Sequence, residues 1–537
     1  MAARTDKALR GVDRQAKAWM KANGVPGMCL AVTGLTRTLK TGAYGLSNID
    51  AGRPVTPGTL FQIGSISKSF AALCAVQLAE QGRLDLHRPV KDYLPWFEVR
   101  SRHAPITLHH LLTHTSGIVT GSDSLIQGVP EAYSLRHTEA SAPPGEHFQY
   151  SNAGYKVVGL VLEEVTGQRT PDILSERVLR PLGMSSTAAE ITNGLRPRFA
   201  ESYIDELDDR PRPLDGGLAP AAWIESETAD GSISSTPGDM ARYLRMLMGR
   251  GRAPKGRVVS EESFSLMTRK AAEYDETGGY GYGLVVEDWD GHRLVRHTGG
   301  MIGFFSSMVM DMDLGIGVFA SINGPGEPER LTRHVLGTIR AAEEGRTDAG
   351  MRGQLDPYTV PDAATYAGTY SDGTRKVRFT ARGDSLSVVL GRRTVRLDMR
   401  SKDAFYAHDP ALEMFLLRFG RSHGKVTEVA HGPELFTKEG VRARGTRTSP
   451  KGWEAFTGHY RSHNPWMSNF RVVSRHGALV MVLPSGSEEK LHPAGGGMFR
   501  IGDDPKSPER IAFDMVVGGK AHRARVNWGE YARTFTP

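Results

Sequence analysis

Ser65 and Lys68 stand three residues apart at the start of the apolar run GSISKSFAAL. In a helix, this spacing places both side chains on one face, one turn apart. The first turn of a helix also presents unpaired backbone N–H groups and the positive end of the helix dipole. Such a setting stabilises a serine oxygen as it attacks a carbonyl, with a lysine near enough to share its proton. The pattern therefore indicates nucleophilic catalysis.

The same Ser-x-x-Lys string occurs twice more, from Ser422 to Lys425 and from Ser487 to Lys490. Both of these copies fall in turn-like stretches between short strand patterns, and we interpret them as surface positions without a catalytic role. The copy at Ser65 differs because a glycine turn precedes it and an apolar helix follows it. Its place in the chain, rather than the string itself, makes it the candidate.

A second candidate element is Tyr150-Ser151-Asn152, which follows a Pro-Pro-Gly turn and precedes a helical pattern. A tyrosine just ahead of a helix N-terminus can have its phenolate stabilised there, and the Asn152 amide can bind a substrate carbonyl. Taken alone, the same residues fit ordinary packing and helix capping equally well.

A third candidate element is His297-Thr298-Gly299-Gly300, at the end of the strand-like run RLVRHTGG. Two glycines let a ligand approach the strand backbone closely, and N–H groups there can complete an oxyanion hole. By itself a histidine at a strand end is often only a polar edge. All three elements, however, lie at element boundaries within one block of the chain, so we interpret them as one site.

The elements that must position these residues follow an α+β pattern. Helical spacing of apolar residues predicts a helix over Leu9–Met20, and helices are expected to begin near Ser65, Thr107 and Asn152. Two strands are expected at Gly27–Thr33 and Leu39–Leu46, with short strand-like runs after Leu284 and a last helix near 327–343. Helices in the middle and an antiparallel sheet late in the block favour an α+β fold over strict β-α-β alternation.

A repeat occupies the rest of the chain. Residues 346–360 are polar and punctuated by Gly and Pro, which predicts a linker after a catalytic domain at 1–345. Beyond it, Tyr366-Ala-Gly-Thr-Tyr370 matches Phe456-Thr-Gly-His-Tyr460. Both copies continue as alternating strands with glycine turns. We therefore predict two small antiparallel β-domains, barrels or sandwiches, at 361–448 and 449–537.

The composition excludes several classes of protein. The 537 residues are 39% hydrophobic and 24% charged, as in folded globular chains, and the net charge of +7 is scattered. No nucleic acid partner is therefore expected. The run Phe70–Ala79 is too short for a membrane span. Cys29 and Cys74 lie in apolar runs and suit buried thiols in a reducing compartment. The N-terminus lacks the apolar region of a secretory signal, so we expect a cytoplasmic protein.

The three motifs together resemble those of the serine β-lactamase and penicillin-binding superfamily, and within it the class C β-lactamase-like serine hydrolases. The family motifs are Ser-x-x-Lys, Tyr-x-Asn and Lys/His-x-Gly. Further stretches that look like this family are LFQIGSISKSF, ITLHHLLTHTSGI and DGSISSTPGDMARYL. The resemblance covers roughly residues 8–345 and implies a transpeptidase-like domain, with an antiparallel sheet, flanking helices and an all-α lobe.

The resemblance implies a role for each site residue. Ser65 would be the nucleophile, and Lys68 and Tyr150 would share the proton transfers, with the general base left open between them. His297 would support Tyr150 and the substrate. The expected substrate-binding positions are Asn152 for the acyl amide, Thr298 for a substrate carboxylate, and the backbone at Gly299 and Gly300. The N–H groups of Ser65 and Gly300 would form the oxyanion hole.

In layout the chain is similar to D-aminopeptidases, in which two β-barrel domains follow the catalytic domain. The function expected is therefore a metal-free serine hydrolase without cofactor that cleaves amide bonds of short peptides or amino-acid amides. The alternatives are a carboxylesterase on the same fold, or a DD-peptidase or penicillin-binding protein with weak β-lactamase activity. The partners expected are a small peptide, amide or ester substrate and a second copy of the chain in a homodimer.

Two further clusters have alternative interpretations. His110 and His114 are four residues apart on an expected helix and could resemble a metal pair, but no further ligand stands at metal spacing, so no metal is predicted. Asp503-Asp504 lies in a loop of the last domain. It fits either a solvated turn or, by resemblance to D-aminopeptidases, a site for a substrate ammonium group.

Overall fold

The computed structural model describes residues 2–122, 127–346, 356–441 and 449–534. The chain divides into two compact units. The first unit comprises Met1–Ile204, Leu218–Met351 and Lys506–Pro508, and the second comprises Asp205–Gly217, Arg352–Pro505 and Glu509–Pro537. Most of the predicted linker at 346–360 lies outside the described residues, and the predicted domain boundaries stay predictions.

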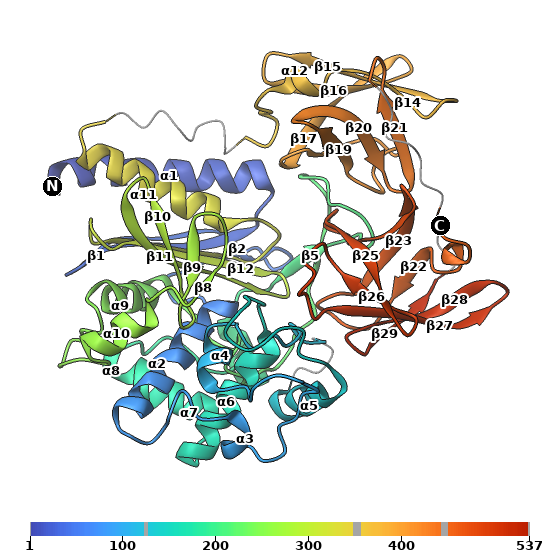
Figure 1. The fold of residues 1–537 in the computed structure, drawn as a ribbon. Coiled ribbons are helices and arrows are strands. Elements are labelled where there is room, and N and C mark those ends of the chain that lie inside the picture. The colour runs from blue at the N-terminus through green and yellow to red at the C-terminus, as the bar shows by residue number, and fades with distance from the viewer. Residues whose placement is uncertain (1, 123–126, 347–355, 442–448, 535–537) are drawn as a thin grey trace. The chain divides into compact units, whose positions relative to one another are not determined.

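A nine-stranded antiparallel sheet forms the centre of the first unit (Figure 1). Every residue of its seven-residue strand β13 is buried, because helices cover both faces of the sheet. The strand order is β3 (Arg53–Pro54), β2 (Thr38–Asn48), β1 (Gly27–Gly34), β13 (Ile316–Ile322), β12 (Phe304–Asp311), β11 (His292–Met301), β10 (Val285–Trp289), β9 (Gly278–Tyr280) and β8 (Ala272–Glu273).

Helices α1 (Ala2–Asn23) and α11 (Pro328–Glu343) pack together on one face of this sheet (Figure 1). The predicted helix over Leu9–Met20 is confirmed within α1, where its apolar positions are buried. The helix ends before Gly24, which has a left-handed φ of 60°.

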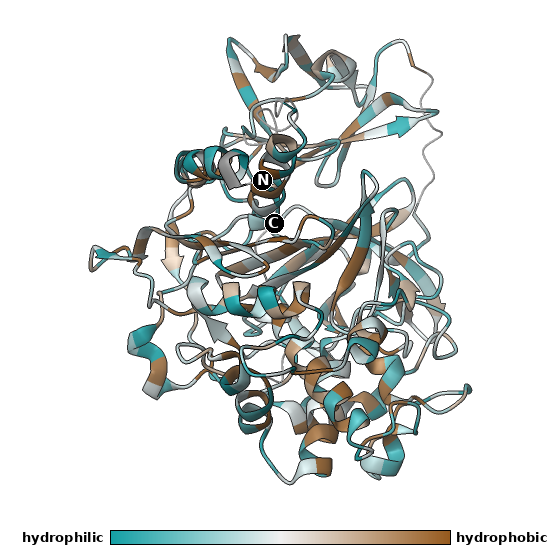
Figure 2. Cartoon of the chain, turned by 90° about the vertical axis from the view of Figure 1, so that its left-hand side faces the viewer, coloured by the Kyte–Doolittle hydropathy of each residue, from teal (hydrophilic) through white to brown (hydrophobic). Residues whose placement is uncertain are grey.

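The other face of the sheet carries α9 (Pro237–Met248), and a layer of helices surrounds α2 (Ser67–Glu80). Helix α2 is buried from Ser67 to Leu78, which is why its sequence is apolar on all sides. Hydrophobic residues accordingly line the helices in the lower part of Figure 2. The remaining helices of this layer are α3 (Val90–Tyr93), α4 (Leu108–Leu112), α5 (Gly128–Ser134), α6 (Asn152–Thr166), α7 (Thr170–Leu174), α8 (Arg180–Leu182) and α10 (Glu261–Met267).

The second unit contains two closed eight-stranded antiparallel barrels. The repeat predicted two β-domains, and the barrel form is the one that the resemblance to D-aminopeptidases implied. The first barrel consists of β14 (Gly368–Ser371), β15 (Lys376–Arg382), β16 (Ser385–Leu390), β17 (Arg393–Ser401), β18 (Ala404–Ala407), β19 (Leu417–Ser422), β20 (Lys425–His431) and β21 (Glu434–Lys438). The second consists of β22 (Gly458–Arg461), β23 (Asn469–Arg475), β24 (Ala478–Val482), β25 (Glu488–Gly495), β26 (Met498–Ile501), β27 (Arg510–Val517), β28 (Lys520–Val526) and β29 (Gly529–Arg533).

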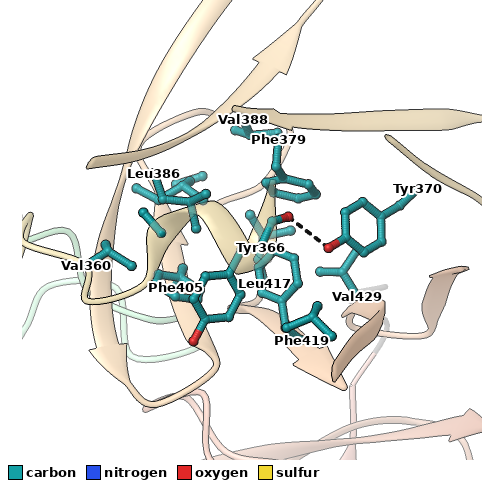
Figure 3. Packing of buried hydrophobic residues seen from close by; sticks show 14 of the residues in the cluster. Val360, Tyr366, Tyr370, Phe379, Leu386, Val388, Phe405, Leu417, Phe419 and Val429 are labelled. Carbon is teal, nitrogen blue, oxygen red and sulfur yellow. Dashed lines mark hydrogen bonds between the residues drawn. The ribbon is translucent and has the colours of Figure 1, made fainter. Parts of the chain in front are cut away.

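The repeated tyrosines have the same structural role in both barrels. Tyr370 donates its hydroxyl to the carbonyl oxygen of Tyr366 at 2.8 Å, inside a core of aromatic and aliphatic side chains (Figure 3). Tyr460 donates in the same way to the carbonyl of Phe456, also at 2.8 Å. In each barrel this bond ties the first strand to the short helical turn that precedes it.

The second unit also includes Asp205–Gly217, a segment far from the barrels in sequence. The Asp208 carboxylate accepts hydrogen bonds from Arg461 at 2.5 Å and from Ser468 at 3.0 Å. Asn469 donates to the Asp208 carbonyl, and Arg471 forms an ion pair with Asp209. The sequence did not indicate this association.

Candidate active site

Ser65 lies in a short 3₁₀ helix, Gly64–Ile66, directly before α2. The α-helix therefore begins at Ser67, two residues later than the sequence predicted. Gly64 has a left-handed φ of 54°, and a Cβ added to it would lie 2.7 Å from the backbone N and O of Gly300. A glycine is required there, because the turn that carries Ser65 packs directly against strand β11.

Lys68 is fully buried and reaches from α2 toward Ser65. Its Nζ donates to Oγ of Ser65 at 2.9 Å, to Oδ1 of Asn152 at 2.8 Å and to the carbonyl oxygen of Asp230 at 2.8 Å. One ammonium group thus connects Ser65 with Asn152, which lies in a distant part of the sequence.

Tyr150 lies in the segment just before α6, which begins at Asn152. Ser151 caps this helix by accepting a hydrogen bond from the N–H of Gly154 at 2.9 Å. The ring centroid of Tyr150 is 5.0 Å from Nζ of Lys68. The structure therefore brings Tyr150 next to Lys68 and directs Asn152 toward the same group.

The third motif lies within β11, which pairs with β12 along Thr298, Gly299 and Gly300. A Cβ at Gly299 would lie 1.9 Å from the carbonyl oxygen of Ile63 and 3.1 Å from the nitrogen of Ser65. Both glycines of the motif thus pack against the turn that carries Ser65. Gly299 lies close to Ile63 and Ser65, and Gly300 lies close to Gly64.

A pocket of about 230 Å³ opens beside these residues. Six of the eight predicted site residues line it, and the other two, Lys68 and Asn152, connect to Ser65 through hydrogen bonds. The lining residues are Ser65, Tyr150, Tyr274, Tyr280, Val285, Arg296, His297, Thr298, Gly299 and Gly300.

Both ring nitrogens of His297 are hydrogen-bonded. Nδ1 lies 2.5 Å from the carbonyl oxygen of Thr298, and Nε2 lies 2.8 Å from the hydroxyl of Tyr280. A carbonyl oxygen can only accept, so Nδ1 carries the proton and Nε2 accepts from Tyr280. Burial lowers the pKa of His297 to about 3, although the bond to Thr298 acts in the opposite direction. The imidazole is therefore neutral, and its support of Tyr150 stays a prediction.

Four residues of the pocket were missed by the sequence analysis: Tyr274, Tyr280, Val285 and Arg296. Tyr280 stands in the run GGYGYG, and glycines on both sides of an aromatic residue were the available signal. Arg296 directly precedes His297, but an arginine in a strand gives no indication of what its guanidinium contacts.

The Arg296 guanidinium is surrounded by carboxylates. It contacts Glu287 at 2.6 Å, Asp275 at 2.9 Å and Glu329 at 3.5 Å. Arg333 also contacts Glu287, at 2.7 Å. Hydrogen bonds hold the pKa of the Asp275 and Glu287 carboxyls below their ordinary values despite burial, so both are ionised. Two guanidinium groups thus face three carboxylates, and the cluster has a net charge of −1.

The two histidines that could resemble a metal pair have separate roles. His110 lies in α4, where its ring takes part in the N-terminal cap with Thr107. His114 lies beyond the end of α4, and its Nδ1 accepts from the N–H of Ser151 at 3.0 Å. The four-residue spacing therefore does not place them on one helix face.

The acidic residue Asp503 is already paired within the second barrel. Its carboxylate accepts from Nζ of Lys490 at 3.0 Å and is 2.9 Å from Nε2 of His492. The bond to Lys490 holds the pKa of Asp503 below its usual value. This pairing favours the solvated-turn interpretation of that loop.

None of the helices in the described ranges combines the length and the apolar character needed to cross a bilayer.

Comparison with known proteins places this geometry in one family. The family model described as Beta-lactamase matches residues 12–341. Penicillin-binding protein 4 of Amycolatopsis lactamdurans is 32% identical over 365 residues, which cover 64% of this chain and 93% of that protein. Protein flp of Staphylococcus aureus is 25% identical over 364 residues, covering 65% of this chain and 70% of that protein.

Two solved structures extend the similarity into the second unit. The octameric penicillin-binding protein homologue from Pyrococcus abyssi aligns with a TM-score of 0.61 at 26% identity, over 80% of this chain and all of that one. SurE shares the fold with a TM-score of 0.53 at 22% identity, over 81% of this chain and 99% of that one. The family match spans the whole candidate site. The chain therefore belongs to the Beta-lactamase family and is a serine hydrolase of that fold.

Proposed function

We propose that this hydrolase cleaves amide bonds of short peptides or amino-acid amides through an acyl-enzyme on Ser65. The observation that carries the proposal is the 2.9 Å hydrogen bond from Nζ of Lys68 to Oγ of Ser65. It joins a buried cation to a serine that lines the pocket. Oγ attacks the carbonyl carbon, the amine leaves, and water then hydrolyses the ester.

Of the two candidate general bases, the contacts favour Tyr150. Nζ of Lys68 donates to three oxygen acceptors, namely Ser65 Oγ, Asn152 Oδ1 and the Asp230 carbonyl. Donation to each of these oxygens supports Lys68 as a cation throughout the reaction. A phenolate at Tyr150, whose ring centre is 5.0 Å from Nζ, is stabilised by that charge. The phenolate takes the proton of Ser65 and passes it to the leaving nitrogen.

The N–H groups of Ser65 and Gly300 are the proposed oxyanion hole. The close approach of Gly64 to Gly300, where a Cβ would be 2.7 Å from the backbone, supports this assignment. Two such donors stabilise the negative oxygen of the tetrahedral intermediate, and loss of one typically lowers the rate by ~10²–10³-fold. On the other side of Ser65, the Asn152 amide is proposed to bind the acyl part of the substrate.

The charges of the pocket favour a leaving group without a carboxylate. Of the ten described residues that line it, Arg296 is the one with a permanent positive charge, and three carboxylates already contact its guanidinium. His297 is neutral. A free carboxylate would therefore lose hydration without gaining an unpaired cation. The pocket therefore favours a leaving group that ends in an amide over one that ends in a free carboxylate, such as the amino acid that a DD-carboxypeptidase releases. Carboxylate binding by Thr298 is accordingly expected only in the DD-peptidase alternative.

The carboxylesterase and the DD-peptidase remain the competing functions. The penicillin-binding proteins among the relatives favour the DD-peptidase. SurE, which shares the fold, has been solved with D-Leu, and this favours a substrate that contains a D-amino acid. A panel of D- and L-alaninamide, D- and L-alanyl anilides, D-alanyl-D-alanine, benzylpenicillin and p-nitrophenyl acetate separates them. The proposal predicts the highest kcat/KM for amides or anilides, and a preference for D-alanyl-D-alanine or for the ester would favour the respective alternative.

Fluorophosphonate labelling tests the nucleophile. Mass spectrometry should locate the adduct on Ser65, and Ser65→Ala should abolish both labelling and turnover. Ser422→Ala is the matched control, because Ser422 heads another Ser-x-x-Lys string in a barrel. An adduct elsewhere, or amide turnover that survives Ser65→Ala, would falsify the proposal.

We also propose that the protein acts in the cytoplasm and forms homodimers. Cys29 and Cys74 are buried free thiols, which suits a reducing compartment. Cell fractionation and light scattering test the two statements; recovery of the native enzyme outside the cytoplasm, or a monomer at micromolar concentration, would contradict them.

A further inference from the structure

His114 is a fully buried residue with an unusual backbone conformation. It follows α4 and has a φ of 56°, in the left-handed region that non-glycine residues seldom occupy. Such a conformation persists only where surrounding contacts impose it, and such residues cluster at functional sites. Several contacts of His114 involve Tyr150 and the residues on either side of it in the chain.

Three separate contacts join His114 to the Tyr150 segment. The N–H of Gln149 donates to the carbonyl oxygen of His114 at 2.7 Å. The N–H of Ser151 donates to Nδ1 of His114 at 3.0 Å. Between these two bonds, the rings of His114 and Tyr150 lie with centroids 4.2 Å apart at an interplanar angle of 36°. One residue thus binds the backbone on both sides of Tyr150 and contacts its ring.

The imidazole is suited to this contact because it stays neutral. Nδ1 accepts from Ser151, so the proton is on Nε2, which is buried and has no hydrogen-bond partner among the described residues. Burial holds the pKa of His114 well below its ordinary value, and the charge of Lys68 acts in the same direction. The groups that face the ring are Tyr150, Tyr155, Tyr280 and Phe148.

We propose that His114 is the residue that positions the Tyr150 phenol for proton transfer with Ser65. The inference rests on the proposed role of Tyr150 as general base. Displacement of a reacting group by about 1 Å can cost roughly 10²-fold in rate, so fixing the tyrosine on both flanks has a direct catalytic consequence. His114 itself does not touch the substrate or exchange protons in this scheme.

Two variants separate the contacts. His114→Asn retains an acceptor for Ser151 and tolerates left-handed backbone, but it removes the ring. His114→Phe retains a ring and removes the acceptor. The matched control is His423→Phe, because His423 also has a left-handed φ, of 47°, and is exposed in the β19–β20 turn. For each protein we would measure the unfolding midpoint, kcat and KM separately, and the pH profile of Ser65 labelling by fluorophosphonate.

Both His114 variants should lower kcat by about 10- to 100-fold with less than threefold change in KM, and they should move the half-maximal pH of labelling upward. The upward shift is expected because a phenol displaced from Lys68 loses the charge that stabilises its phenolate. His423→Phe should leave kcat and the profile unchanged. A folded His114→Phe with the parent's kcat and pH profile would overturn the inference, as would a decrease explained wholly by unfolded protein. If the parent is not labelled at Ser65, the proposed function fails instead.

Discussion

The hydroxyl of Tyr280 donates to Nε2 of His297 at 2.8 Å, because the carbonyl oxygen of Thr298 holds the proton of the imidazole on Nδ1. Nδ1–H points to the carbonyl oxygen of Thr298, so the ring is locked in one tautomer between a phenol and the strand backbone. His297 therefore faces the pocket as a fixed neutral group.

Tyr280→Phe should lower kcat/KM about tenfold and the free energy of unfolding by about 1–3 kcal/mol, because Nε2 of His297 is left without its donor. Tyr282→Phe is the control: Tyr282 stands two residues on and bonds to Nδ1 of His109 at 2.7 Å, outside the pocket. Denaturant unfolding and steady-state kinetics measure both. Equal kinetic effects in the two variants would refute a special role for Tyr280.

Gly64→Ala should reduce fluorophosphonate labelling of Ser65 by about 100-fold or more, because the new Cβ would press on Gly300 and displace an oxyanion donor. Gly52→Ala shares the left-handed conformation, with φ of 59°, and has nothing within 4 Å of the added Cβ. Gly52→Ala should therefore lower the free energy of unfolding by roughly 1–2 kcal/mol through its left-handed φ, but it introduces no clash. If both variants lose labelling to the same degree, steric closeness to Gly300 is not the cause.

Acid should destabilise the first unit. The pKa of His297 is lowered to about 3 and that of His114 lies well below 6.5, so between pH 3 and 6.5 the unfolded chain binds more protons than the folded one. The stability is complete above pH 6.5 and falls with decreasing pH, by about 1.4 kcal/mol per unit for each such histidine.

Urea unfolding at pH 7 and pH 5, with the loss of Ser65 labelling as the probe, measures this effect. His114→Asn cannot titrate and should lose about 2 kcal/mol less between these pH values than the parent. An identical acid loss in the two proteins would contradict burial of a neutral His114.

The leaving-group preference can be measured with one matched pair, D-alanyl-D-alanine and its C-terminal amide. We expect kcat/KM for the amide to exceed that for the free acid by at least about tenfold, because the pocket provides no unpaired cation. Asp275→Asn removes one carboxylate from Arg296 and should narrow the ratio. Asp288→Asn, which alters only a turn carboxylate that accepts from Gly291, should leave it unchanged. If kcat/KM is nearly equal for the amide and the free acid in the parent protein, the charges of the pocket do not determine the leaving-group preference.

The sequence predicted those features that depend on nearby residues. Turn residues and helical spacing located α1 and the region of α2, and alternating spacing indicated that the repeat forms β-structure, because local propensity and burial agree there. Ser65 and Lys68 were found for the same reason, as neighbours on one turn. The start of α2 was placed two residues early, since a 3₁₀ turn and the first turn of an α-helix look alike in sequence.

The contacts of Tyr280, Arg296 and His114 could not be predicted in this way. Tyr280 meets His297 across 17 residues and His114 meets Ser151 across 37. The partners of Arg296 come from three separate elements. Their roles arise only when the sheet and the helical layer pack together.

The assignment of Asp205–Gly217 and Lys506–Pro508 bears on how this protein can be dissected. A fragment ending at residue 345 would retain Asp208 and Asp209 but lose Arg461 and Arg471, which pair with them. It would also lack Lys506, whose carbonyl accepts from Ser141. A fragment of residues 361–537 would keep Arg461 and Arg471 without their carboxylates. Fragments separated at the predicted linker are thus expected to be less stable than the whole protein. Any assay of the barrels for ligands is better done on the intact polypeptide.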